Sequence, residues 1–144
     1  MAFLDDINSD ICFLSETWLK SEKCSTTSII QDYSFNIVHN IRVSGNGGGT
    51  ALILKDTGLP YRKCNTGVFS TFEITKIQLV CHSKIIFFCL YRPPGFGSVF
   101  LNFIQEFSNF ISEIVSSPFP FLIGGDFNIP VMIDITLTVK HFLI

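Results

Sequence analysis

Short apolar runs separated by polar turns make up the first half of this sequence, and this pattern predicts strands. Residues 11–14 (ICFL), 35–41 (FNIVHNI) and 50–55 (TALILK) are short and rich in β-forming side chains. A glycine cluster at residues 45–49 (GNGGG) is typical of a turn, and no Gly-Lys-Ser/Thr follows it as in a phosphate-binding loop. We therefore expect a hairpin between the second and third of these strands.

Two longer runs follow in the middle of the chain. Residues 71–80 (TFEITKIQLV) alternate between apolar and polar positions, with a phase slip between Ile74 and Ile77 that we interpret as a β-bulge. Residues 84–91 (KIIFFCLY) are almost wholly apolar, which is typical of a central strand covered on both faces. Residues 81–84 (CHSK) are predicted to form the hairpin turn between these two strands.

One segment, residues 99–115, has the period of an α-helix, and Ser98 is its predicted N-cap. Such an apolar stripe can form a groove for a partner, but packing of the helix on a sheet is the commoner explanation. The residues of the stripe are Phe100, Phe103, Ile104, Phe107, Phe110, Ile111 and Ile114. The apolar run at 121–124 (FLIG) predicts a further strand, so the order of elements indicates an α/β or α+β fold with a mostly buried sheet.

Length and composition predict one core-rich domain or part of one. The 144 residues are 47% hydrophobic, with 16 phenylalanines and only 15% charged side chains, which excludes a disordered chain. The net charge of −2 gives no overall basic surface, which lowers the expectation of nucleic-acid binding without excluding it. The odd number of cysteines, without a Cys-x-x-Cys pair, favours free thiols in a reducing compartment and gives no indication of a zinc site.

The ends of the chain bear on where the protein acts. The first ten residues (MAFLDDINSD) are acidic and lack the basic start of a signal peptide. No apolar run reaches the roughly 18 residues of a membrane span. We therefore expect an intracellular protein that is neither secreted nor embedded in a membrane.

Polar side chains with catalytic potential follow two of the apolar runs. Glu16 lies just past a predicted strand, where open α/β sheets place ligand sites, although an isolated Ser-Glu-Thr is better explained as a solvated turn. Asp126 and Asn128 follow Gly124 and Gly125, which would let substrate or backbone approach closely. If the extended geometry continues, the acid and the amide point to the same side, but an Asx turn explains them equally well.

A third group, Tyr91 and Arg92 of YRPP (91–94), follows the most apolar strand. The tyrosine offers a phenolic hydrogen bond and the arginine a planar cation suited to phosphate, whereas the simple alternative is a surface turn. Together with Glu16, Asp126 and Asn128 they would form a hard oxygen site. Such a site suits Mg²⁺ or Mn²⁺ rather than zinc, and it fits metal-assisted hydrolysis of a phosphodiester.

The histidines do not extend this site. No acid that would orient an imidazole flanks His39, His82 or His141 in the sequence, and we interpret all three as ordinary histidines.

The motifs SETW, NGGGTALIL, LYRPPG and GDFN occur in an order that resembles the endonuclease/exonuclease/phosphatase superfamily. The match is nearest to the apurinic-like endonuclease domain of LINE-type (non-LTR) retrotransposons, and it covers roughly residues 5 to 130. The resemblance implies a four-layer α/β sandwich with two facing sheets and outer helices. It also implies Mg²⁺-dependent nicking of DNA, a nuclear location for a functional copy, and a reverse transcriptase domain in the full-length element.

The same resemblance implies roles for individual residues. Glu16 is similar to the metal-binding glutamate, and Asp126 to the aspartate that contacts the metal and orients the attacking water. Asn128 resembles the amide that positions the phosphate, and Tyr91 the tyrosine that hydrogen-bonds the scissile phosphate.

Two parts of the family pattern do not appear in this chain. An opening strand with an active-site Asn is expected before residue 5, and a second catalytic Asp with a late Ser-Asp-His is expected after GDFN. We therefore interpret residues 1–130 as an incomplete, partial sandwich and residues 131–144 as a divergent tail, and we expect an inactive copy. The alternatives are a non-catalytic interaction module that retains the fold, or a phosphatase of the same superfamily acting on lipid or nucleotide phosphates.

Overall fold

The computed structural model describes residues 9–21, 24–42, 47–82 and 84–129, which form seven strands and two helices. In chain order the elements are β1 (Ile11–Ser15), α2 (Ser25–Asp32), β2 (Phe35–Asn40), β3 (Thr50–Lys55), β4 (Tyr61–Cys64), β5 (Glu73–Leu79), β6 (Ile86–Tyr91), α3 (Ser98–Val115) and β7 (Phe121–Asp126). The predicted tail at 131–144, with His141, lies outside these residues. In the described part of the chain, neither helix is long and apolar enough to span a membrane.

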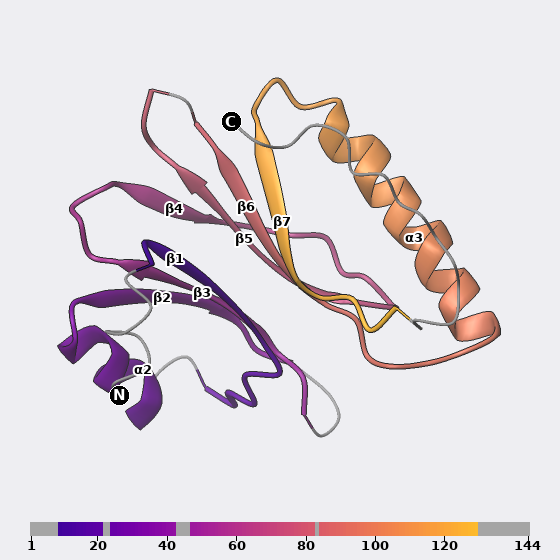
Figure 1. Ribbon diagram of the computed structural model, residues 1–144, viewed down its shortest axis with the longest axis horizontal. Helices are drawn as coiled ribbons and strands as arrows, with labels where there is room; N and C mark the ends of the chain where they lie inside the picture. The colour runs from indigo at the N-terminus through magenta and orange to yellow at the C-terminus, as the bar shows by residue number, and fades with distance from the viewer. Residues whose placement is uncertain (1–8, 22–23, 43–46, 83, 130–144) are drawn as a thin grey trace.

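The strands form two sheets (Figure 1). The three-stranded sheet has the order β1-β3-β2 and is antiparallel throughout, and the pairing of β2 with β3 confirms the predicted hairpin. The four-stranded sheet has the order β4-β5-β6-β7. Its first two pairs are antiparallel, whereas β7 runs parallel to β6 because α3 carries the chain back between them.

Three apolar clusters separate four layers. Ile30 of α2 packs with Ile53 on the outer face of the three-stranded sheet. Leu52 and Ile77 belong to the cluster between the two sheets. Phe103 and its helical neighbours cover the outer face of the four-stranded sheet, along which α3 runs in Figure 1. The described residues therefore form a mixed α/β structure in which two facing sheets lie between two helices.

The prediction of a bulge in β5 was wrong. The strand pairs with β6 in an unbroken register over residues 73–78. Phe72 and Ile74 belong to the cluster under α3, while Ile77 and Leu79 belong to the cluster between the sheets. The apparent phase slip arises because this strand is buried on both faces, so that its apolar side chains change from one face to the other.

The local sequence also explains the remaining differences between the predicted and the observed elements. Gly97, with φ of 59°, is the N-cap of α3, so the helix begins at the predicted N-cap Ser98. The sequence pattern missed α2, because only Thr27 and Ile30 of this short polar helix are buried. It also missed β4, whose sequence YRKC is polar and lies at the edge of its sheet.

Candidate active site

Three polar side chains lie side by side at one end of the four-stranded sheet. Glu73 is the first residue of β5, and its register partner is Tyr91, the last residue of β6. Tyr91 is in turn the register partner of Asp126, the last residue of β7. Directly opposed residues share a face of a sheet, and the neighbouring Cys89 places that face toward the three-stranded sheet. The strand ends therefore present a phenol between two carboxylates.

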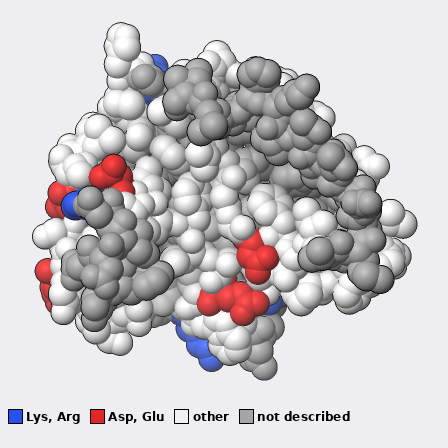
Figure 2. Space-filling model, viewed as in Figure 1, with Lys and Arg blue, Asp and Glu red and all other residues white. Residues whose placement is uncertain are grey.

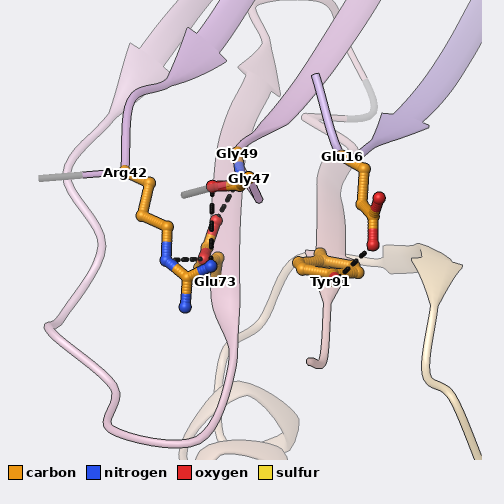
Figure 3. A network of polar contacts seen from close by, with 6 residues as sticks. All are labelled: Glu16, Arg42, Gly47, Gly49, Glu73 and Tyr91. Atoms are coloured by element: carbon orange, nitrogen blue, oxygen red, sulfur yellow. Dashed lines mark hydrogen bonds and ion pairs between the residues drawn. The ribbon is translucent and has the colours of Figure 1, made fainter. Parts of the chain in front are cut away.

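Glu16 reaches the same place from the opposite sheet. It follows the end of β1 in the left-handed region, with φ of 52°. The hydroxyl of Tyr91 donates a hydrogen bond to Oε1 of Glu16 (Figure 3). The structure thus brings together two predicted site residues that stand 75 positions apart in the chain.

The Tyr91 phenol is held in its protonated form. Tyr91 is only 4% exposed, and this burial is the main reason that the pKa of its hydroxyl is raised to about 12. The hydrogen bond to Glu16 adds to the effect, as do the charges of Glu16, Glu73 and Asp126. At neutral pH the phenol is therefore a permanent donor, and three carboxylates lie close enough to act on it.

Asp126 and Asn128 form a compact pair just beyond β7. The backbone N–H of Asn128 donates to Oδ1 of Asp126 at 3.0 Å, and its side-chain amide donates to Oδ2 at 3.2 Å. Asn128 has φ of 45°, so the two residues meet through an Asx turn and not along a continued strand. The same amide also donates to the backbone oxygen of Arg92 at 2.7 Å, which fixes it beside β6.

Arg92, which the sequence predicts to contact a substrate phosphate, is bonded to other parts of the protein. It is 1% exposed, and its guanidinium donates to the carbonyl oxygens of Asn128 and Gly95, each at 2.6 Å. The cation also stacks over Phe100 and Phe103 of α3, at 5.0 and 5.1 Å from the ring centres. These contacts bury the guanidinium and tie it to the turn that carries Asn128, which gives Arg92 a structural role there; its contact with a substrate phosphate stays a prediction.

The two glycines before Asp126 serve close packing of the chain. A Cβ on Gly124 would lie 2.8 Å from the ring of Phe13 in the three-stranded sheet. Gly125 has φ of 133°, and a Cβ there would lie 1.9 Å from the carbonyl oxygen of Leu90 on β6. Of the two predicted uses of these glycines, the structure shows the close approach of neighbouring protein atoms.

Comparison with known protein families shows to which family this chain belongs. The model of the Endonuclease/Exonuclease/phosphatase family matches residues 1–134. The chain belongs to this family. No curated protein matches the sequence.

Members of the endonuclease/exonuclease/phosphatase family typically depend on Mg²⁺, and the side chains at this site fit that ion. The carboxylates of Glu16 and Asp126 are exposed, and both are hard oxygen donors. Within the described ranges no three His, Cys, Asp or Glu side chains gather as a metal site, but Mg²⁺ keeps several waters and needs only one or two protein carboxylates. Figure 2 shows acidic side chains close together on one face of the domain. Their negative charges produce a field that attracts a cation.

Sequence reasoning missed Glu73. It stands alone in an alternating strand, and no motif singles it out. Its importance depends on register, which places it next to Tyr91, and on its bond from the backbone N–H of Gly49. Gly49, from the glycine cluster that the sequence indicated only as a turn, is therefore also part of this site.

Proposed function

We propose that this domain hydrolyses phosphodiester bonds in DNA with Mg²⁺, as an endonuclease of the LINE-type retrotransposon class, in place of the inactive copy expected from the sequence. The observation that carries the proposal is the bond from Tyr91 to Glu16, which joins the two sheets where Asp126 and Asn128 are also held. Two carboxylates, a protonated phenol and a primary amide suit the hydrolysis of a phosphate ester, in which negative charge grows on oxygen.

Each side chain has a separate task in this proposal. Glu16 and Asp126 would hold Mg²⁺, which when bound offsets negative charge on the phosphate. Tyr91 fixes one oxygen of Glu16 through its hydroxyl proton, so the other oxygen stays available. Asp126 orients the attacking water, and Asn128, itself held by the carbonyl of Arg92, positions the phosphate. Tyr91 keeps its proton at neutral pH, because its pKa is raised to about 12, and it acts as a hydrogen-bond donor only.

A groove beside the site supports a nucleic-acid substrate. It has a volume of about 560 Å³ and runs from Glu73 along the segment between β4 and β5. Arg42, Lys63 and Lys76 line it, although the chain as a whole carries a net charge of −2. Local basic side chains attract a phosphate backbone regardless of net charge. The motif YRPP at residues 91–94 favours the retrotransposon class over the phosphatases by resemblance.

Nicking of supercoiled plasmid by the purified 144-residue chain tests the proposal. We expect nicked circles with Mg²⁺ and none with a chelator, and we expect Asp126→Asn and Asn128→Ala each to slow the reaction by about 10²-fold or more. Glu113→Gln, at an exposed position of α3, is the matched control and should nick like the wild type.

The same assay separates the alternatives. Absence of Mg²⁺-dependent nicking would overturn the proposal and return us to the inactive copy expected from the sequence. Nicking that survives Asp126→Asn unchanged would overturn the site. Release of inorganic phosphate from nucleotides without nicking would indicate the phosphatase branch.

A further inference from the structure

The glycine segment, residues 47–49 directly before β3, is hydrogen-bonded to the backbone that follows Glu16. The N–H of Thr17 donates to the carbonyl oxygen of Gly49 at 3.2 Å, and the N–H of Trp18 donates to that of Gly48 at 3.0 Å. These are the two residues directly after Glu16. The position of the Glu16 carboxylate therefore depends on where the glycine segment lies.

Only glycine fits at these positions. Gly48 and Gly49 have φ of 81° and 88°, in the left-handed region that other residues rarely adopt. A Cβ on Gly49 would lie 2.6 Å from the hydroxyl of Thr17, and one on Gly48 would lie 2.7 Å from Oε1 of Glu73. The missing side chains let the segment fit between Glu73 on one side and the Glu16 backbone on the other.

Glu73 holds this segment from the opposite sheet. Its Oε2 accepts a hydrogen bond from the N–H of Gly49 at 2.5 Å, and its Oε1 lies 3.1 Å from Nε of Arg42 (Figure 3). The Glu73 side chain is only 20% exposed, so the contacts are partly shielded from water. Both carboxylate oxygens are engaged by the protein, which leaves Glu73 poorly suited to bind a metal itself.

The same glutamate is the register neighbour of Tyr91. Glu73 is therefore connected to both members of the Glu16–Tyr91 pair. It reaches the backbone after Glu16 through Gly49, and it lies beside Tyr91 in the sheet. A shift of Glu73 would move the backbone after Glu16 relative to the phenol that fixes its carboxylate.

We propose that Glu73 is a positioning residue, which acts through Gly49 to set the Glu16 carboxylate against Tyr91 and so prepares the Mg²⁺ site. The inference rests on the proposed function, since it assigns Glu16 to the metal. It gives Glu73 no direct contact with substrate.

Trp18 provides a readout that needs no catalysis. It is the only tryptophan in the sequence, it is 61% exposed, and its ring is close to Gly47, where a Cβ would lie 3.3 Å from it. Its fluorescence therefore reports on the junction between the glycine segment and the backbone after Glu16. Acrylamide quenching and anisotropy of Trp18 measure how well that junction is held.

The test compares three variants of the full chain with the wild type. In Glu73→Ala we expect stronger quenching and lower anisotropy of Trp18, and a Mg²⁺ midpoint for nicking raised by about tenfold or more, as for other residues that orient metal ligands. Glu73→Gln keeps an acceptor for the N–H of Gly49 but loses the ion pair with Arg42, so its effect on both measurements should be clearly smaller than that of Glu73→Ala. Glu113→Gln is the control for loss of an acidic side chain elsewhere.

A purely structural role would lower the melting temperature without changing either measurement in the folded protein. Wild-type quenching of Trp18 in folded Glu73→Ala would overturn the inference, and so would an equal effect of Glu73→Gln. If Glu73→Ala does not fold, Glu73→Asp decides, because it withdraws the carboxylate from Gly49 but keeps the charge. If the wild type does not nick DNA, the proposed function fails, while Trp18 still reports whether Glu73 holds the segment.

Discussion

Replacement of Arg92 by methionine should destabilise the domain as a whole. Methionine keeps an unbranched apolar chain that can pack against Phe100 and Phe103, but it removes the guanidinium that donates to the carbonyls of Asn128 and Gly95. Each hydrogen bond from a charged group contributes about 1.5–3 kcal/mol, and loss of the donor leaves buried acceptors unpaired. Two such bonds give an expected loss of about 3–6 kcal/mol.

Thermal unfolding followed by circular dichroism measures this loss. For a chain of this size, about 3–6 kcal/mol corresponds to a melting temperature lower by roughly 10–20 °C. Arg62→Met is the matched control, because Arg62 is exposed on β4 and bonds only the side chain of Gln78 among the described contacts. It should change stability by about 1 kcal/mol or less.

The two possible roles of Arg92 predict opposite results. An arginine that binds substrate phosphate would, on replacement, weaken DNA binding and leave the melting temperature within about 2 °C of the wild type. That outcome would refute the structural role argued from its burial. A lower melting temperature together with slower nicking agrees with the structure, because Asn128 would lose its support.

Three further predictions concern other parts of the domain. Glu16→Gln should lower the pKa of Tyr91 from about 12, since the carboxylate charge disfavours the phenolate; an ultraviolet titration that leaves the value unchanged would contradict the pairing. Gly125→Ala should cost more than about 3 kcal/mol in denaturant unfolding, because the new methyl would overlap the carbonyl of Leu90, and near-wild-type stability would show that β7 can shift. Burial raises the pKa of Glu106, but hydrogen bonds from the segment before β5 outweigh it and leave that pKa lowered. Its stabilisation is therefore present above the unfolded value and lost as pH falls through the folded value, so Glu106→Gln should flatten the acid side of a melting-temperature profile.

Sequence pattern predicted the elements whose burial has a clear period. The stripe of α3 is an example, because helix geometry alone brings Phe103 and Phe110 to one face. It failed at β5, where burial on both faces mimics a bulge. It also failed at α2, because two buried residues in a polar helix give too weak a period.

The residues of the candidate site divide in the same way. Some are indicated by local motifs, and others become apparent only in the folded structure. Local motifs predicted Glu16, Tyr91, Asp126 and Asn128 as site residues, and the structure places them at one end of the sheets. Glu73 was missed because its position beside Tyr91 is a property of strand register, which no local motif encodes. The burial of Arg92 was missed for a similar reason, since the rings that cover it come from α3.

Each sheet is built from one continuous part of the chain. The strands of the three-stranded sheet all precede residue 56, those of the four-stranded sheet all follow residue 60, and the exposed residues 56–60 join them. The candidate site belongs to neither half, because Glu16 lies in the first and its partner Tyr91 in the second. The domain therefore consists of two sheet-forming halves with the candidate site between them, and the natural point of division is the exposed five-residue connection.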